Sequence, residues 1–359
     1  MQLRKLNLVN YKNFLDANFE FHSKIVCFTG QNGKGKTNIL DSIYHLANTK
    51  SYFSSVAQQS INFEADFYVI EGDFLKEGVP YQVVCSLKKG QKKVLKRNGK
   101  PYEKFSDHIG LIPVVIVSPF DNDLIQEGSE VRRKLIDQII SQLDKEYLET
   151  LIKYQRILNQ RNTLLKYFAN NKTFDADTLD IYDFQLAELG ELIYSKRKDF
   201  IEVFSPIFKK YYAIICDEKE QVELQYQSTL TQQRMYTALK DTIQKDRVLQ
   251  YTFTGIHKDD LVFLLNRYPV KKFGSQGQQK SFLIALKLAH FEFVKQKYNV
   301  KPILLFDDVF DKLDKFRVQK IVELVNKNTF GQIFISDTDK ERTEQIIRQT
   351  KLEYQIFEL

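Results

Sequence analysis

The stretch Gly30–Thr37 reads GQNGKGKT and matches the pattern G-x-x-x-x-G-K-[ST] without a gap. Ile25–Thr29 (IVCFT), directly before it, is apolar enough for a short buried strand, and Thr37–Ala47 carries apolar residues at helical spacing. A strand, a glycine-rich loop and a helix in this order form a phosphate-binding loop, because backbone N–H groups and the helix N-terminus favour phosphate. The context argues against a chance glycine-rich turn, and we predict a nucleotide site.

Each residue type of the loop has an expected task. Lys36 would bridge the β- and γ-phosphates, and the Thr37 hydroxyl would bind Mg²⁺. The residues expected to contact ATP are Gly30, Gln31, Asn32, Gly33, Lys34, Gly35, Lys36, Thr37 and Asn38.

A second element is the stretch Pro302–Asp308, PILLFDD, in which apolar residues end in two adjacent carboxylates. An apolar strand that ends in surface acids is common by itself, but together with the phosphate-binding loop it predicts a Walker B strand. Asp307 would hold the magnesium ion, with Thr37, and Asp308 would orient or deprotonate the attacking water. The predicted catalytic residues are therefore Lys36, Asp307 and Asp308.

A third element, Gly274–Lys280 (GSQGQQK), lies directly before the expected helix Ser281–Val294. A serine, a glycine and a helix N-terminus supply a hydroxyl, an amide and a positive dipole end, all suited to phosphate. The alternative is an ordinary polar helix cap. Since one chain needs only one phosphate-binding loop per nucleotide, a second such helix start implies a nucleotide contacted from two sides.

The rest of the chain predicts an α/β fold with helices inserted between two strand-rich parts. Before residue 118, strands are expected at Leu3–Leu8, Phe19–Phe21, Phe67–Phe74 and Tyr81–Leu87, in a hairpin around Asn98-Gly99, and at Leu111–Val117. Helical spacing then runs through Glu130–Tyr167 and Thr178–Lys198, and Pro206 is expected to bend the chain back. Strands return at Val222–Tyr226, Leu261–Asn266 and Ile303–Phe306.

A chain of 359 residues exceeds the usual size of one core, so we expect more than one domain. The expected division is an N-terminal head part at residues 1–119, an inserted helical lobe at 120–250 and a C-terminal head part at 251–359. No stretch approaches the roughly 18 apolar residues of a membrane helix. Cys27, Cys85 and Cys216 have neither metal nor disulfide spacing, which favours reduced thiols in a cytoplasmic protein.

The ordered set of phosphate-binding loop, signature, Walker B strand and following loop is that of ABC-type ATPases, and the chain resembles the RecF family, related to SMC heads. The finer similarity lies in LNLVNYKNF (6–14), GKGKTNILDSIY (33–44), VSPFDNDLIQEGSEVRR (117–133), YQRILNQRNTLLK (154–166), GIHKDDL (255–261), GSQGQQK (274–280) and ILLFDDVFDKLD (303–314). These segments span nearly the whole chain in the family's order. The resemblance implies an ABC-type ATPase head, built from both chain ends, with an inserted helical lobe.

The resemblance also implies that two copies pair head to tail around two ATP molecules. The signature residues that would contact the partner's γ-phosphate are Ser275, Gln276, Gly277 and Gln278, and those of the D-loop are Asp311 and Asp314. Lys12 matches a basic position expected near the nucleotide. Such proteins bind gapped or junction DNA, with single- and double-stranded parts, and work with RecR and RecO to place RecA on single strands. The implied activity is a weak, DNA-dependent ATPase in which ATP acts as a dimerisation switch in DNA repair, replication restart and the SOS response.

The chain departs from ABC transporters in several places. The strand Ile333–Asp337 (IFISD) ends without a switch histidine, and Ser336 or Thr338 is expected to contact the γ-phosphate instead. Asp308 stands where many ABC proteins have glutamate, which suggests slow hydrolysis. The Q-loop is expected within Ser118–Gln126. His257 is either catalytic or, as we favour, a hydrogen-bonded histidine in a structural turn.

A basic stretch suggests where DNA binds. Residues 88–104 read KKGQKKVLKRNGKPYEK, and on a hairpin these charges would form one positive face. The candidate DNA contacts are Lys88, Lys89, Lys92, Lys93, Lys96 and Arg97. The alternative is a solvated edge hairpin whose lysines prevent edge-to-edge pairing. Arg132, Arg133 and Arg161 either face DNA or pair with acids, and the net charge of +7 permits a polyanionic partner without requiring one.

Two other functions stay open at this point. One is an SMC-like structural or nuclease-associated ATPase, which would carry far longer coiled-coil arms or a nuclease domain. The other is the ATPase subunit of an ABC transporter, against which the missing switch histidine and the long helical insertion argue.

Overall fold

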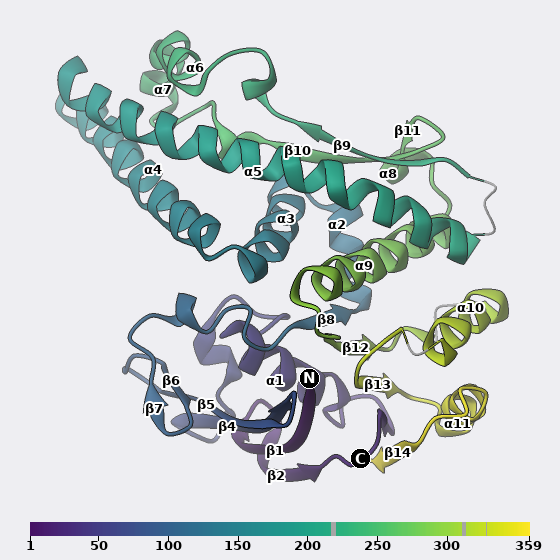
Figure 1. Ribbon diagram of the computed structural model, residues 1–359. Helices are drawn as coiled ribbons and strands as arrows, with labels where there is room; N and C mark the ends of the chain where they lie inside the picture. The colour runs from purple at the N-terminus through teal and green to yellow at the C-terminus, as the bar shows by residue number, and fades with distance from the viewer. Residues whose placement is uncertain (217–219, 311–313, 328) are drawn as a thin grey trace. The chain divides into compact units, whose positions relative to one another are not determined.

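The computed structural model describes residues 1–216, 220–310, 314–327 and 329–359 (Figure 1). The chain divides into two compact units. Unit 1 consists of Met1–Asn122, Lys210–Lys219 and Gln276–Leu359, and unit 2 of Asp123–Lys209 and Glu220–Ser275. Among the described residues, no helix combines the length and the apolar character that crossing a membrane requires.

Unit 1 contains an antiparallel sheet. Its strands, in spatial order, are β2 (Phe14–Glu20), β1 (Gln2–Tyr11), β4 (Phe67–Lys76), β5 (Val79–Lys88), β6 (Val94–Arg97) and β7 (Lys100–Pro101). The first two predicted strands lie side by side, with Leu6 of β1 opposite Phe19 of β2. Asn98 and Gly99 both have positive φ, 49° and 78°, as a two-residue hairpin turn of this kind requires.

A parallel sheet forms the second layer of unit 1. Its order is β14 (Tyr354–Glu358), β3 (Ile25–Thr29), β13 (Ile333–Asp337), β12 (Ile303–Asp307) and β8 (Val114–Val117). Every residue of β3, β13, β12 and β8 is buried, which explains their uninterrupted apolar sequences. The predicted strand Leu111–Val117 begins only after Pro113 because a turn occupies the residues before it.

One helix joins the two sheets of unit 1. Helix α1 (Lys36–Asn48) contacts β4 and β5 of the antiparallel sheet and β8, β12 and β13 of the parallel sheet. Its apolar side chains, with those of both sheets, form one continuous core. The other helices of unit 1 are α9 (Gln276–Tyr298), α10 (Lys315–Asn326) and α11 (Lys340–Arg348), with short 3-10 turns at Ala57–Ser60, Phe105–Asp107 and Pro119–Asn122.

Unit 2 is mainly helical and carries a small sheet. The sheet order is β11 (Tyr268–Pro269), β10 (Asp260–Leu265) and β9 (Val222–Gln227). Its helices are α2 (Asp123–Gln126), α3 (Ser129–Leu143), α4 (Lys145–Asn171), most of α5 (Ala176–Cys216), α6 (Met235–Asp241), α7 (Ile243–Leu249) and α8 (Val270–Phe273), with 3-10 turns at Thr229–Thr231 and Ile256–Lys258.

Two helix predictions were wrong in detail. The expected helix Glu130–Tyr167 is two helices, because the Asp144 carboxylate accepts a hydrogen bond from the backbone N–H of Tyr147 at 2.9 Å and so caps α4. Pro206 does not bend the chain back but lies inside α5. The aromatic residues around it, including Phe204 and Phe208, are buried, and this packing outweighs the hydrogen bond that a proline cannot donate.

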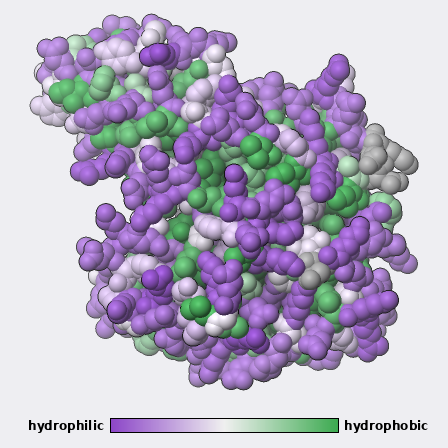
Figure 2. All heavy atoms as spheres, in the orientation of Figure 1, coloured by the Kyte–Doolittle hydropathy of each residue, from purple (hydrophilic) through white to green (hydrophobic). Residues whose placement is uncertain are grey.

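The unit boundaries also differ from the expected division of the chain. Residues 251–275, expected in the head, cluster with unit 2 because β10 pairs along its whole length with β9. Residues 210–219, expected in the lobe, cluster with unit 1. Figure 2 shows that hydrophilic residues cover most of the visible surface, with smaller apolar areas between them.

Candidate nucleotide-binding site

The loop between β3 and α1 has the backbone shape of a phosphate-binding loop. Gly30, Gly33 and Gly35 have φ of 141°, 85° and 101°, a range that side chains with a Cβ rarely adopt. A Cβ on Gly30 would lie 2.7 Å from the backbone oxygen of Leu359, and one on Gly35 would lie 2.5 Å from the Asn13 side chain. The glycines of the sequence pattern are therefore required by conformation and by space.

Lys36 is folded over this loop. Its Nζ donates hydrogen bonds to the backbone oxygens of Gly30 at 2.6 Å and Gln31 at 2.9 Å. The residue is only 4% exposed, so its charge is held against the loop rather than in solvent. This is the position from which an ammonium group can meet phosphates cradled by the loop.

Asn13, which the sequence analysis did not single out, supports the loop from the side. Asn13, in the turn between β1 and β2, donates through Nδ2 to the backbone oxygen of Lys34 at 3.2 Å. Its Oδ1 accepts from Asn38 Nδ2 at 2.7 Å. The asparagine thus ties the loop and the first turn of α1 to the antiparallel sheet.

Asp307 and Thr37 lie in direct contact although 270 residues separate them. Thr37 Oγ1 donates to Asp307 Oδ1 at 2.7 Å, and Ser336 Oγ donates to the same oxygen at 2.8 Å. Ser118 Oγ donates to Asp307 Oδ2 at 3.1 Å. Since β8, β12 and β13 are parallel, their carboxyl ends meet at one edge of the sheet and gather these side chains.

This donor set suits a magnesium ion. One carboxylate and neighbouring hydroxyls match the way Mg²⁺ is held in phosphate sites, where the nucleotide and waters supply the remaining ligands. Asp307 and Thr37 would hold the ion, and the hydrogen bond between them would give way to it. Ser118 is the residue of this set that the sequence analysis did not name individually.

Asp308 follows directly on the metal carboxylate. Its backbone has a φ of 47°, and its N–H donates to Ser336 Oγ at 3.0 Å. Ser336 is buried, donates to the Asp307 carboxylate and accepts from the Asp308 backbone N–H, whereas Thr338 is exposed. The serine for which we expected a contact with the γ-phosphate thus holds the Asp307 carboxylate and the backbone at Asp308.

Lys12 forms an ion pair with a buried acid of α1, the helix that follows the phosphate-binding loop. Its Nζ lies 2.6 Å from Asp41 Oδ2, and Asp41 is fully buried on α1. The carboxylate also accepts hydrogen bonds from Tyr11 OH at 2.9 Å, Ser51 Oγ at 2.6 Å and the Tyr52 N–H at 2.6 Å. Burial and the neighbouring Asp41 carboxylate raise the pKa of Tyr11 well above its ordinary value, so its phenol stays a donor.

Comparisons with known proteins agree with this geometry. A family model described as an AAA domain matches residues 5–252. The chain is 61% identical over its full length to the DNA replication and repair protein RecF of Flavobacterium johnsoniae, and the match covers 100% of both chains. The chain belongs to the RecF family of DNA replication and repair proteins. The RecF protein of Phocaeicola vulgatus is 46% identical, over 99% of this chain and 96% of the relative.

Solved structures confirm the fold class that we predicted. A structure of the recombination mediator protein RecF-ATPrS in the RecFOR pathway has a TM-score of 0.89 and 27% identity, covering 100% of this chain and 96% of that one. An Smc head domain from Pyrococcus furiosus has a TM-score of 0.54 at 15% identity, covering 97% and 91%, and shares the fold alone. The sequence similarity to RecF over the full length of the chain decides against the SMC-like ATPase and the transporter subunit.

The residues of the RecF-like signature lie at the start of α9. Gln276 begins that helix, and the boundary between the two units falls between Ser275 and Gln276. Ser275 and Gln276 are exposed, while Gly277 and Gln278 are half-buried. Of the predicted D-loop, Asp311 lies outside the described residues. Asp314 caps α10 by accepting from the backbone N–H of Arg317 at 2.9 Å.

The basic hairpin formed by β5 and β6 shows most of its charges to solvent. The exposed residues are Lys88, Lys89, Lys92, Lys96 and Arg97. Lys93 differs from them, because it is half-buried and its Nζ donates to the backbone oxygen of Thr49 while lying 5.3 Å from the Phe105 ring centre. The Arg97 guanidinium lies 5.7 Å from the Tyr102 ring centre. Five of the six predicted DNA contacts are therefore accessible.

Three arginines of unit 2 are engaged within the protein, two of them by carboxylates. Arg161 is fully buried and lies 2.6 Å from both Asp183 and Asp246. Arg132 donates to both carboxylate oxygens of Asp260 at 2.7 and 3.0 Å, and Arg133 to the backbone oxygen of Asp259. Of the two roles that the sequence left open, pairing with acids is found for Arg132 and Arg161, whereas Arg133 bonds a backbone oxygen and the Ser129 hydroxyl.

His257 is engaged on both sides of its ring. Nε2 lies 3.0 Å from the backbone oxygen of Thr252, which can only accept, and Nδ1 lies 2.8 Å from Tyr154 OH. Burial lowers its pKa to about 4, so the ring is neutral, with the proton on Nε2. These contacts agree with the role that we favoured from the sequence, that of a hydrogen-bonded histidine in a structural turn.

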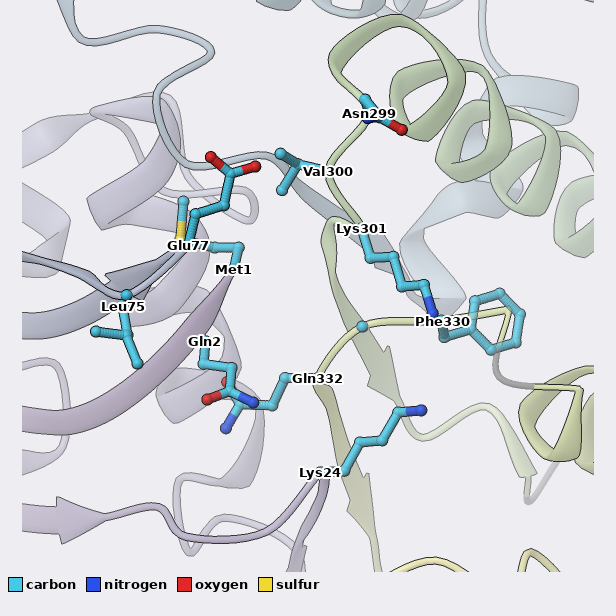
Figure 3. Close-up of a pocket in the computed structure, with 12 residues that line it drawn as sticks. Met1, Gln2, Lys24, Leu75, Glu77, Asn299, Val300, Lys301, Phe330 and Gln332 are labelled. Carbon is cyan, nitrogen blue, oxygen red and sulfur yellow. The ribbon is translucent and has the colours of Figure 1, made fainter.

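A separate cavity of about 530 Å³ lies at the opposite edge of the parallel sheet (Figure 3). It is lined by residues that precede the strands, among them Lys24 before β3, Lys301 before β12 and Gln332 before β13. The Gln332 side chain bonds both backbone groups of Leu3, at 2.7 and 3.0 Å. The cavity is therefore separated from the phosphate-binding loop by the length of the strands.

Proposed function

We propose that this RecF-family protein is an ATP-dependent DNA-binding protein that pairs as a homodimer on binding ATP with Mg²⁺. The observation that carries the proposal is the contact of Thr37 with Asp307 beside a glycine loop capped by Lys36. These three side chains supply a phosphate contact and a magnesium site in one place. Relatives described as RecF bound to ATP or to ATPrS have the same fold.

The proposed dimer would complete each nucleotide site with residues of the second copy. Ser275, Gln276, Gly277 and Gln278 of one chain would contact the γ-phosphate that Lys36 of the other holds, with Asp311 and Asp314 at the interface. Support comes from the exposure of Ser275 and Gln276 at the start of a long helix, where hydroxyl, amide and dipole favour an anion. In this arrangement unit 1 is the ATPase head and unit 2 the inserted lobe.

Hydrolysis in this dimer would be slow. Asp308 is the proposed residue for orienting water, and its side chain is one methylene shorter than the glutamate of many ABC proteins. ATP would then act as a timed switch for DNA binding rather than as fuel for motion. The proposed DNA is a gapped or junction substrate, bound through exposed charges of the β5–β6 hairpin. RecR and RecO would be partners in placing RecA, in the cytoplasm.

Ser275→Arg tests the dimer directly. A bulky cation at an exposed position of the signature should block the approach of a second copy but leave Lys36 and Asp307 untouched. We expect monomeric ATP affinity to stay within about twofold, while ATP-dependent dimerisation and gapped-DNA binding are lost. Calorimetry with ATP, sedimentation and fluorescence anisotropy with labelled gapped DNA measure the three quantities.

The matched control is Thr173→Arg, which places the same cation on another exposed hydroxyl residue of unit 2. This variant should dimerise and bind DNA like the wild type. If Ser275→Arg also dimerises normally with ATP, the signature is not part of the interface and the proposed dimer is wrong.

A further inference from the structure

A buried ion pair ties α9 to the segment that follows β8. Lys287 Nζ, on α9, lies 2.6 Å from Asp121 Oδ1, and the two side chains are only 4% and 1% exposed. The Lys287 ammonium also donates to Tyr52 OH at 3.1 Å and lies 5.2 Å from the centre of that ring. Both residues belong to unit 1, and neither was singled out as a nucleotide contact, although Asp121 lies in the range in which the Q-loop is expected.

From Asp121 a chain of hydrogen bonds continues to the proposed metal carboxylate. Asp121 Oδ2 accepts from the backbone N–H of Ser118 at 2.8 Å. Ser118 Oγ then donates to Asp307 Oδ2 at 3.1 Å, and Asp307 Oδ1 accepts from Thr37 at 2.7 Å. Every link from Lys287 to Thr37 is therefore a direct contact.

A second branch joins the same pair to α1. Tyr52 OH donates to Asp121, and the Tyr52 N–H donates to Asp41 Oδ1 at 2.6 Å. Asp41 in turn pairs with Lys12. The segment Ser118–Asp121 is thus held from α9 on one side and from α1 on the other.

The chemistry of this pair favours a role beyond stability. Burying a lysine and an aspartate costs desolvation free energy, and a well-packed apolar pair of similar volume is often as stable or more so. Outer hydrogen-bond partners of a metal ligand, by contrast, set the orientation of that ligand and alter metal affinity strongly when removed. Ser118 is such a partner of Asp307, and Asp121, itself paired with Lys287, holds Ser118 in turn.

We propose that Lys287 and Asp121 are positioning residues that fix Ser118, and through it the Asp307 carboxylate, in the orientation that binds Mg²⁺. Because α9 begins in the signature motif, the relay Lys287–Asp121–Ser118–Asp307 connects the helix that would contact the partner's ATP with the metal site of its own chain. The inference rests on the proposed function, since it takes Asp307 as the magnesium ligand.

Three variants separate positioning from stability. Lys287→Met removes the ammonium, and Lys287→Met with Asp121→Asn removes both charges, so that no uncompensated buried charge remains. Lys287→Arg restores a cation as the conservative rescue. The matched control is Lys295→Met, which breaks a partly exposed pair with Glu292 at 3.0 Å on the same helix.

The readouts are thermal unfolding, ATP affinity in EDTA, and the Mg²⁺ concentration that gives half-maximal ATP hydrolysis. We expect ATP affinity in EDTA to stay within about twofold for all variants, since the glycine loop is intact. The half-maximal Mg²⁺ concentration should rise about tenfold or more in Lys287→Met and in the double variant. It should return toward the wild-type value in Lys287→Arg and stay unchanged in Lys295→Met.

Two outcomes would overturn the proposal. A double variant that folds and keeps the wild-type Mg²⁺ dependence would show that the relay does not position Asp307. A lower melting temperature of Lys287→Met with unchanged Mg²⁺ dependence would show a purely structural pair. Failure of the proposed function is distinguishable, because the wild-type protein itself would then show no Mg²⁺-dependent ATP binding, and the relay would have no site to serve.

Discussion

Three of the five histidines, His45, His108 and His290, are buried, and His257 is half-buried. Burial lowers the pKa of His45, His108 and His257 to about 4, and that of His290 to about 3. The first three have hydrogen-bond partners on their rings, such as Tyr68 OH at 3.3 Å from His45 Nε2. Within the described part of the chain, neither ring nitrogen of His290 has a partner. At neutral pH all four rings are therefore uncharged.

Acid should destabilise the protein through these residues. An unfolded histidine has a pKa near 6.5, so below that pH the unfolded state binds more protons than the native one. The stability is fully present above pH 6.5 and is lost as the pH falls toward the folded values of about 4 and about 3. Each histidine contributes a loss of about 1.4 kcal/mol per pH unit in that window.

His290→Leu isolates one of these contributions. The variant removes a buried ring without hydrogen bonds and keeps an apolar side chain of similar volume. Between pH 7 and pH 5 its unfolding free energy should fall by about 2 kcal/mol less than that of the wild type. Urea unfolding at both pH values measures this. His22→Gln, at an exposed position, is the control, and equal pH dependence of His290→Leu and wild type would contradict the prediction.

At the scale of single elements, the β5–β6 hairpin presents a row of cations at one end of the antiparallel sheet. The strands pair in register from Val83 opposite Arg97 to Ser86 opposite Val94. The short edge strand β7, only two residues long, limits further pairing, so the lysines are not needed to protect a long edge. This geometry favours phosphate contact over the alternative of edge protection.

Charge reversal on this hairpin should weaken DNA binding in a salt-dependent manner. Lys88→Glu with Lys96→Glu should lower the affinity for gapped DNA at least tenfold at about 0.1 M salt. The slope of log K against log salt should also fall by about one for each phosphate that the hairpin no longer neutralises. Fluorescence anisotropy across a salt series measures both.

The control for this experiment is Lys327→Glu with Lys351→Glu, two exposed lysines outside the hairpin. It carries the same change in net charge. A salt slope of the hairpin variant equal to that of the control would rule out hairpin contacts. Lys93 is left out of the set because its ammonium is turned inward onto the backbone of Thr49.

Elements with local signals were predictable from the sequence. Gly30–Thr37, the strand Ile25–Thr29 and the Asn98-Gly99 turn each depend on residues adjacent in the chain, and each has the expected structure. The helix boundary at Asp144 and the continuity of α5 through Pro206 were missed. In the first case a single aspartate caps a helix, and in the second burial of distant side chains overrides a local preference.

In the candidate site, the residues that belong to recognisable sequence motifs were predictable, and the residues that support them were not. Lys36, Thr37 and Asp307 come from recognisable patterns, and the structure brings Thr37 and Asp307 into contact. Ser118 and Asp121 lie in a segment that carries the family resemblance, but their roles depend on β8 pairing beside β12, nearly 200 residues away in the chain. Lys287 likewise appears in the sequence as one lysine of a long helix. Long-range strand order, which a single sequence does not give, decides these contacts.

At the scale of the whole molecule, unit 1 is formed largely by the N-terminal and C-terminal parts of the chain. Strand β3 lies between β13 and β14, so the strand that leads into the phosphate-binding loop is held on both sides by C-terminal segments. The signature residues open α9, whose Lys287 contacts the segment next to Asp307. One chain thus carries both a phosphate-binding loop and a second candidate phosphate contact, which is the basis for expecting a dimer around two nucleotides.

The most direct test of ATP-driven pairing is sedimentation velocity of the full chain with and without ATP, in the presence of Mg²⁺ and a gapped duplex. We predict a monomer without nucleotide, a dimer with ATP, and a faster complex when the gapped duplex is added. Ser275→Arg should remain a monomer under all of these conditions. Identical sedimentation of the wild-type protein with and without ATP, on and off DNA, would contradict the ATP-closed dimer.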